Sequence, residues 1–385
     1  MSKSKRPLWI AVLLLTFSLL TLSGVSAQTS DQTLFMTFVP NVQFSPVYVA
    51  IEKGYFSDAG LNVNVEYGDE PVGVDLVASG ERQFAVISGE QVIAARANAR
   101  PVVYVYQWFQ RFPVGIVVTD NSGIQSVSDL VGHAVGVPGR FGASYSGLIA
   151  VLGANGLSER DISLQEIGFN APDALCLGVV EAASVYINNE PLQIQNRIDA
   201  GDCGSVTGIH VFPVSDAANM VSNGLITNED TIANDPALVQ AMVTAFDHAL
   251  SDVIRNPAEA YLLSEAHIDT LGISDTLRAA LQAAADETSA YLDANPQASR
   301  EDVAAQRQHT LETLSASFDA ATLLQFRVLL NTIDLWDADQ LGATDPAAWD
   351  TTLQTLITLG TLDSAIDLSG AYTSDFLIGT VPASS

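Results

Sequence analysis

Hydrophobic residues along this chain are grouped in short runs that alternate with polar turns and with segments of helical spacing. The run 34–39 predicts a buried strand. After a polar turn, Pro46 can begin a helix, because the first helical turn has no partner for the N–H that proline lacks. Gly54 and Gly60 then predict two helix ends. Similar units follow as far as residue 255, so we expect an α/β fold.

The alternation of strands and helices breaks at two places. Strands are predicted at 102–106 and 114–119 with no helix between them, and the connecting segment is rich in aromatic residues: Trp108, Phe109 and Phe112. From residue 257 onward, alanine and leucine recur at helical spacing, and a last amphipathic helix is predicted at 349–359. The chain therefore ends in a helical region.

The first 27 residues predict a secretory signal peptide. A basic start, an apolar run from Leu8 to Leu22 and the small residues 25–27 have the order that such signals share. No cysteine lies near the expected cut, which argues against a lipid anchor. No later stretch reaches ~18 consecutive apolar residues, so we expect the mature chain to be soluble and exported.

The composition is strongly acidic, with a formal net charge of −28. Removing residues 1–27 leaves 13 basic residues, of which Lys53 is the one lysine, against 44 acidic ones. Such a surface repels nucleic acid and anionic lipid, so neither is expected as a partner. Export permits a disulfide between Cys176 and Cys203. We favour this bond, and two free thiols are the alternative.

Four segments together carry a resemblance to a known family: "PN–x₆–YVA–x₂–KGYF–x₃–GL" at 40–61, "GLITNED" at 224–230, the helix begun by Pro236, and the tail 368–376. They resemble the substrate-binding proteins of ABC importers in the group that carries thiamine pyrimidine precursors, sulfonates and nitrate. The resemblance is strong over residues 34–255 and weak beyond them.

The resemblance implies a two-lobed periplasmic-binding-protein-like fold of type II, with the ligand in the cleft between the lobes. The strand pair around residues 107–113 would be where the chain crosses between lobes. We expect the first lobe to contain 31–113 and 213–330, and the second lobe 114–212. Residues 331–385 would form a C-terminal helical segment packed on the first lobe.

Candidate ligand contacts follow the strands, because ligands of open α/β sheets bind beyond the carboxyl ends of the strands. Ordinary turn chemistry, helix capping and inter-lobe packing are the competing interpretations. Capping is the simpler role for Ser88, since Gln91 stands where a capping box would place it. The candidates are Asn41, Gln43, Phe44, Ser88, Glu90, Trp108, Gln110, Arg111, Phe141, Tyr145, Tyr186, Asn188, Asn189 and Glu190.

These candidates suit a flat, uncharged ligand that accepts and donates hydrogen bonds, because they combine aromatic faces with neutral polar groups. The segments that depart from the general family pattern look like the branch of riboflavin-binding proteins. The branch that binds the thiamine precursor formylaminopyrimidine is the alternative. A sulfonate or nitrate site would need clustered cations, and the candidate loops hold only Arg111 and Arg140.

An enzyme is the less favoured interpretation. A related fold serves a pyrimidine synthase that uses a cysteine-rich motif, a histidine and a pyridoxal-phosphate lysine. Here the two cysteines are far apart, no histidines stand at metal-ligand spacing, and Lys53 falls at a helix end. We expect no catalysis, cofactor or metal. The expected protein is a periplasmic or cell-surface monomer, peripherally associated with the membrane, whose partners are the permease and ATPase subunits of an importer.

Overall fold

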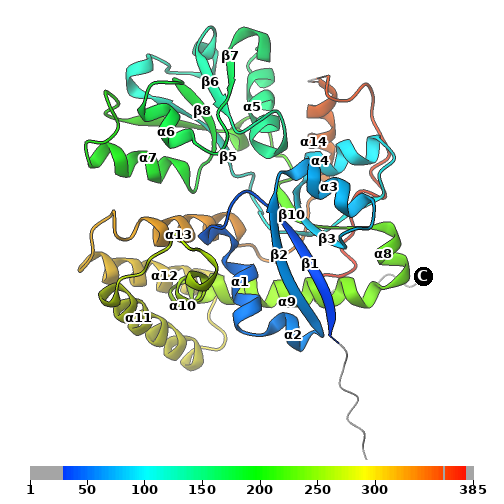
Figure 1. Cartoon of the computed structure of the whole chain (residues 1–385), viewed down its shortest axis with the longest axis vertical. Helices are drawn as coiled ribbons and strands as arrows, with labels where there is room; N and C mark the ends of the chain where they lie inside the picture. The colour runs from blue at the N-terminus through cyan, green and yellow to red at the C-terminus, as the bar shows by residue number, and fades with distance from the viewer. Residues whose placement is uncertain (1–28, 359, 379–385) are drawn as a thin grey trace, which may run out of the picture.

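The protein folds as two α/β lobes, one above the other in Figure 1. The computed structural model describes residues 29–358 and 360–378. The predicted signal peptide lies outside these residues. The described strands form two sheets of five strands each. Helices cover both sheets, which gives the predicted two-lobed α/β architecture.

The sheet of the first lobe has the strand order β2-β1-β3-β10-β4. The strands β1, β2 and β3 are parallel, whereas β10 is antiparallel to both of its neighbours. Leu34 at the centre of β1 is paired with Val65 on one side and Phe84 on the other. The bounds are Ser30–Thr37 (β1), Leu61–Gly68 (β2), Phe84–Ser88 (β3), Val102–Gln107 (β4) and Asn223–Asn228 (β10).

The sheet of the second lobe repeats this arrangement, with the order β7-β6-β8-β5-β9. Here β5 is the antiparallel strand between β8 and β9. In each lobe the antiparallel strand is the first one after the chain crosses from the other lobe, β5 on entering the second lobe and β10 on returning to the first. The bounds are Val114–Thr119 (β5), Ala134–Val137 (β6), Ser163–Glu166 (β7), Ala182–Tyr186 (β8) and Ile209–Pro213 (β9).

Helices of the first lobe pack on both faces of its sheet. Gly54 and Gly60 both have a positive φ, which ends the two helices where the sequence predicts. The long α9 packs against α1 and carries one buried face that includes Val239, Phe246 and Val253. The bounds are Ser45–Glu52 (α1), Tyr55–Asp58 (α2), Glu70–Ala78 (α3), Gly89–Ala97 (α4), Glu229–Asn234 (α8), Pro236–Arg255 (α9) and Pro257–Ser264 (α10).

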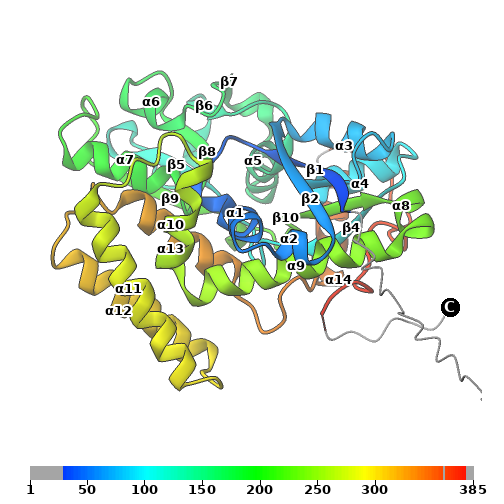
Figure 2. The ribbon, with the colours of Figure 1, turned by 60° about the horizontal axis from the view of Figure 1, so that its bottom comes forward.

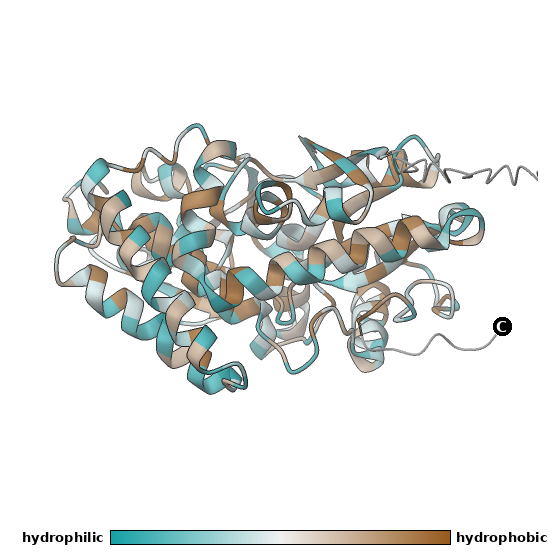
Figure 3. Cartoon of the chain, turned by 90° about the horizontal axis from the view of Figure 1, so that it is seen from below, coloured by the Kyte–Doolittle hydropathy of each residue, from teal (hydrophilic) through white to brown (hydrophobic). Residues whose placement is uncertain are grey.

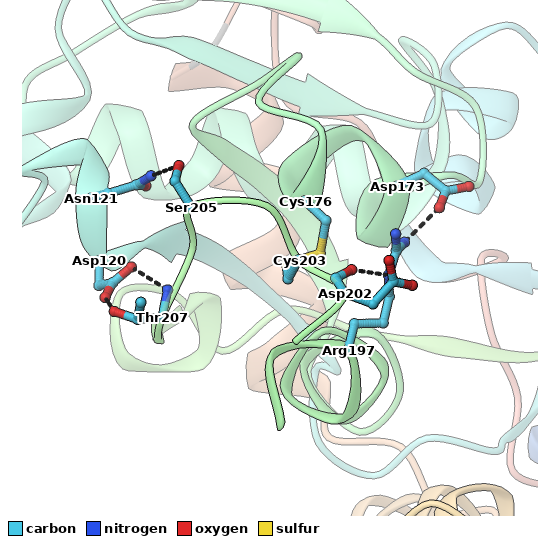
Figure 4. The surroundings of a disulfide bond; sticks show 9 residues. All are labelled: Asp120, Asn121, Asp173, Cys176, Arg197, Asp202, Cys203, Ser205 and Thr207. Carbon is cyan, nitrogen blue, oxygen red and sulfur yellow. Dashed lines mark hydrogen bonds and ion pairs between the residues drawn. A yellow bond between two sulfur atoms is a disulfide. The ribbon is translucent and has the colours of Figure 1, made fainter. Parts of the chain in front are cut away.

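The second lobe has three α-helices among the described residues, Gly142–Ala154 (α5), Ala171–Cys176 (α6) and Glu190–Asp199 (α7). A disulfide joins Cys176, at the end of α6, to Cys203 in the segment between α7 and β9 (Figure 4). Arg197 on α7 is paired with Asp173 on α6 across the same region. The pairing of the two cysteines is the one that we favoured over free thiols.

The C-terminal helices are Asp275–Ala294 (α11), Arg300–Ser315 (α12), Leu324–Trp336 (α13) and Pro346–Thr358 (α14). In Figure 2, α11 and α12 lie side by side and project from the body of the molecule, and in Figure 3 they carry many hydrophilic positions. The helix α13 extends past residue 330, where we expected the C-terminal segment to begin. Both α13 and α14 also contact the second lobe, through α7 and α5.

Short 3-10 helices complete the described structure, at Val42–Phe44 (η1), Asp120–Ser122 (η2), Val127–Leu130 (η3), Glu159–Asp161 (η4), Val214–Asp216 (η5) and Glu265–His267 (η6). Within residues 29–358 and 360–378, no helix combines the length and the apolar character needed to cross a bilayer.

We predict that the disulfide stabilises the second lobe. Closing a loop of this length contributes about 3 kcal/mol to the free energy of unfolding. The double variant Cys176→Ser/Cys203→Ser should therefore unfold at a lower denaturant concentration, which urea titration will measure. Wild-type protein treated with a reducing agent should match the variant, and the variant itself should not respond to the reductant. Equal midpoints for all three samples would contradict the prediction.

Candidate functional site

A pocket lies between the two lobes, with about 930 Å³ of empty space when its open mouth is included. The first lobe contributes the ends of β1 and β2, the start of α3 and the crossing segment after β4. The second lobe contributes the loops after β6 and β7 and the end of β8. Such a position, beyond strand ends and between two lobes, is typical of ligand sites in α/β proteins.

The loop after β1 brings several first-lobe side chains to the pocket. Asn41 accepts a hydrogen bond from the Gln43 backbone N–H, 3.0 Å away, and so caps η1. This short helix directs Gln43 and Phe44 into the pocket lining. Phe38, just before the turn, has a φ of 80°, a left-handed conformation that is unfavourable for a bulky residue. Strain of this kind is often found at ligand sites.

The crossing segment forms an aromatic wall. Trp108 is fully buried, and its ring lies 6.0 Å from that of Phe44 and 5.6 Å from that of Trp336 on α13. Phe109 lies 6.2 Å from Tyr186 of the second lobe, with the rings nearly perpendicular. Trp108, Phe109 and Tyr186 all line the pocket. The wall therefore belongs to the inter-lobe core and to the pocket at the same time.

A second aromatic pair crosses between the lobes. The Phe38 ring of the first lobe and the Phe169 ring of the second lobe are 4.8 Å apart and nearly perpendicular. Both line the pocket, and Phe169 is 43% exposed. Neither residue is among the predicted contacts. Phe38 lies within the apolar run 34–39 that was assigned to a strand, and Phe169 stands in a loop without a sequence signal of its own.

Two hydrogen-bonded groups also connect the lobes. Asn188, beyond β8, donates to Gln43 Oε1 at 2.6 Å and to Thr332 Oγ1 at 2.7 Å, and all three residues are buried. The Tyr186 hydroxyl donates to Asn223 Oδ1 at 2.8 Å. Asn188 thus joins the second lobe to η1 and to α13, while Tyr186 joins it to β10.

Three buried or partly buried glutamates lie at or beneath the pocket. Glu70 and Glu190 line it, whereas Glu90, at the start of α4, lies behind Glu70. Burial raises the pKa of Glu70 and of Glu90, and the charge of Glu70 raises that of Glu90 further. Burial also raises the pKa of Glu190 to about 7, although Glu190 accepts a hydrogen bond from the Tyr186 backbone N–H.

The capping role predicted for Ser88 is wrong. Its hydroxyl oxygen accepts no hydrogen bond from a backbone N–H of α4 and instead lies within hydrogen-bonding distance of Glu70 Oε2, at 2.5 Å, and of Glu90 Oε1. The hydroxyl is thus directed at two carboxyl groups, which accept stronger hydrogen bonds than neutral groups do. The pattern of serine followed by glutamine at the helix start could not reveal the two glutamates.

Several predicted contacts lie outside the pocket lining. Gln110 donates to the Gln107 carbonyl at 2.8 Å, and Arg111 donates to the Asp334 carbonyl on α13. Tyr145 donates to Glu159 Oε2 at 2.7 Å, and Asn189 donates to Glu190 Oε1. These side chains hold the crossing segment and the loops of the second lobe. Of the fourteen candidates, the structure brings to the pocket lining Gln43, Phe44, Trp108, Phe141, Tyr186 and Glu190.

The pocket lining carries acidic and neutral polar groups but no lysine, arginine or histidine among its described residues. Arg140, close in sequence to Phe141, is paired with Glu159 and Glu166. Within residues 29–358 and 360–378, no cluster of histidine, cysteine and acidic side chains is arranged to hold a metal ion. The chemistry of the lining therefore suits an uncharged organic molecule.

The family model and the similar proteins place this chain in the same family. Residues 41–260 match the family model described as NMT1/THI5 like. The chain is 32% identical to the riboflavin-binding protein RibY of Chloroflexus aurantiacus, over 90% of this chain and 86% of that protein. It is 30% identical to the formylaminopyrimidine-binding protein of Halalkalibacterium halodurans, over 47% of this chain and 57% of that protein.

One family of enzymes is also related. A 4-amino-5-hydroxymethyl-2-methylpyrimidine phosphate synthase of Legionella pneumophila is 25% identical, over 62% of this chain and 74% of that protein.

Solved structures share the fold. The ligand-binding component of an ABC-type import system from Staphylococcus aureus has a TM-score of 0.58 at 10% identity, covering 92% of this chain and 100% of that one. The alkanesulfonate-binding protein SsuA of Xanthomonas axonopodis has a TM-score of 0.50 at 15% identity, covering 62% and 79%. These similarities identify the periplasmic-binding-protein-like fold.

We predict that Asn188 stabilises the contact between the lobes. Asn188→Ala removes the donor to two buried oxygens, and leaving buried acceptors unpaired costs about 1–3 kcal/mol. Chemical denaturation should show this loss of unfolding free energy. As a control, Gln195→Ala removes an exposed amide whose bond stays within α7, and its effect should stay within about 0.5 kcal/mol. Equal stability of the two variants would contradict the role of Asn188.

Proposed function

Since the chain belongs to the NMT1/THI5-like family, we propose that it is the extracytoplasmic solute-binding component of an ABC importer, and that its solute is riboflavin. The observation that carries the proposal is the pocket between the lobes, lined by aromatic rings, neutral polar groups and three carboxyl groups, without a basic side chain among its described residues. The similarity to RibY, which extends over 90% of the chain, supports the same solute.

The pocket offers what an isoalloxazine ring needs. Its aromatic lining comes from both lobes, so a planar ligand can lie between rings, and each stacking contact contributes about 0.5–1.5 kcal/mol beyond burial. The pyrimidinedione edge and the ribityl hydroxyls need donors and acceptors, which Gln43, Ser144 and Asn223 provide at the pocket surface. The rings are Phe38, Phe44, Trp108, Phe109, Phe141, Phe169 and Tyr186.

A formylaminopyrimidine is the second candidate solute, because a binding protein for that compound is 30% identical over about half of this chain. Its smaller ring needs the same hydrogen-bonding edge and fewer aromatic contacts. The number of rings around the pocket favours the larger flavin.

A binding role without catalysis fits the placement of the chemically reactive residues. Lys53 is paired with Asp252 and Glu259 at the end of α1, away from the pocket lining. Cys176 and Cys203 are joined in the disulfide. We accordingly propose no cofactor, and riboflavin would be the transported ligand.

We further propose that the protein is exported, works as a monomer and remains peripherally associated with the membrane. The predicted signal peptide at 1–27 and the family both support export. The lobes would close on the ligand about the crossing segments and then deliver it to the permease and ATPase subunits of an importer.

Purified protein should bind riboflavin and quench its fluorescence. Phe169→Ala removes a partly exposed ring from the pocket and should weaken binding by about threefold to tenfold, the equivalent of one stacking contact. Leu177→Ala is the control, since Leu177 is 74% exposed and lies outside the lining. Unchanged fluorescence, together with heat released on adding formylaminopyrimidine, would favour the second candidate solute.

A further inference from the structure

The Glu70–Ser88–Glu90 group is arranged to hold a proton. Glu70 is 6% exposed, Glu90 is 1% exposed and Ser88 is fully buried. The Ser88 hydroxyl faces a carboxyl oxygen of each glutamate but carries a single hydrogen, so it can donate to only one of them. The other carboxyl must then be protonated to make its own contact with the Ser88 oxygen. The geometry therefore requires one shared proton.

No cation offsets a second negative charge at this place. Neither Glu70 nor Glu90 forms an ion pair with a basic side chain of the described residues. Glu90 Oε2 is buried and has no hydrogen-bond partner among the described residues. An ionised oxygen in that position would be neither solvated nor paired, so the proton belongs on Glu90.

Glu70 is also a contact between the lobes. A Cβ atom added at Gly142, the first residue of α5 in the second lobe, would lie 3.1 Å from Glu70 Oε2. Asn223 donates to Glu70 Oε1 at 3.0 Å and accepts from the Tyr186 hydroxyl of the second lobe. Closure of the lobes thus completes the burial of Glu70, and the positive end of α5 favours a single negative charge there.

No other titratable group around Glu70 and Glu90 would stabilise a second negative charge on the pair. Tyr104 faces Glu90 from β4, and Tyr186 faces both glutamates from β8. Glu190 acts on Tyr186 from α7, and Asp69 lines the same pocket beside Glu70. Each of these groups is neutral when protonated and negative when ionised. None of them carries a positive charge that would make the shared proton easier to remove.

We propose that Glu70, Ser88 and Glu90 form a proton-binding site that links lobe closure, and with it the retention of the solute, to one shared proton. The proposal rests on the proposed solute-binding function. In the closed protein the pair keeps its proton, because two buried carboxylates side by side are unfavourable. In the open protein water can solvate Glu70, so the two negative charges repel each other less. Loss of the proton therefore favours the open lobes and release of the solute.

The direction of the pH effect follows from the raised pKa of the pair in the closed protein. The closed protein binds more protons than the open one, so closure takes up a proton once the pH exceeds the pKa values of the open protein. Affinity is full at low pH and falls as the pH rises toward the pKa of the closed pair. With one proton involved, the loss is at most about tenfold per pH unit.

Riboflavin binding followed by fluorescence from pH 6 to 9 tests the link. Wild-type affinity should fall by about tenfold or more across this range. Glu90→Gln replaces the protonated carboxyl by a neutral amide of the same shape, so its affinity should fall clearly less than that of the wild type, and only the change due to Glu190, whose pKa is raised to about 7, should remain. Glu66→Gln, on β2 of the same lobe, is the matched control and should follow the wild type. Parallel curves for all three proteins would overturn the proposal.

Calorimetry and infrared spectroscopy separate this proposal from a purely structural role of Glu90. At pH 8, the wild-type binding enthalpy should change with the ionisation enthalpy of the buffer, because a proton is taken up, whereas that of Glu90→Gln should not. At pH 7 the infrared band of a protonated carboxyl should grow when riboflavin, or formylaminopyrimidine as the second candidate solute, binds to the wild type, and this increase should be smaller in Glu90→Gln and in Glu70→Gln.

The outcomes distinguish the two claims. If riboflavin does not bind but formylaminopyrimidine strengthens the carboxyl band, the proposed solute is wrong and the proton site remains. If riboflavin binds with no dependence on pH or buffer and the band does not grow on binding, the proton site is wrong and the proposed function remains.

Discussion

The packing of Trp108 in the core of the first lobe, beside the pocket, is the contact on which the rest of the structure depends. Its ring is fully buried and lies among Phe44, Phe109, Phe246 and Trp336, which come from separate parts of the first lobe. The chain passes from one sheet to the other directly after this residue. Because Trp108 also lines the pocket, the core that fixes the crossing segment also shapes one wall of the site.

Polar contacts across the pocket complement this apolar centre. Asn188 bonds to Gln43 and Thr332 near the crossing segment, and Tyr186 bonds through Asn223 to Glu70 beneath the pocket. These contacts are directional, so they form only at one relative placement of the lobes. The aromatic wall buries apolar surface, and the side-chain amides of Asn188 and Asn223 specify the closed arrangement of the lobes.

The sequence predicts the sheets well, because their strands are apolar runs with clear turns between them. The strand predicted at 114–119 has the observed bounds, and the absence of a helix after residue 106 correctly marked the crossing. The two helix ends at Gly54 and Gly60 follow from local backbone chemistry and needed no tertiary information. The family resemblance indicated the two-lobed arrangement, which periodicity alone does not give.

The sequence predicts the site less completely, because its members meet only through tertiary contacts. Gln43 and Tyr186 were recognised from their places after strands, but Phe38 and Phe169 form a pair across the lobes that no local pattern indicates. Ser88 looked like a helix cap because Glu70 is 18 positions away in the chain. Arg111 and Tyr145, in contrast, stand in the right loops but bond to neighbouring structure.

The most direct test of the account is to identify the molecule that the protein holds when it is isolated from its native cells. The protein would be purified without added ligand and denatured, and the released compound would be identified by its absorption spectrum and mass. The account predicts riboflavin, at up to one molecule per chain. Release of a formylaminopyrimidine instead, or of a sulfonate, would contradict it.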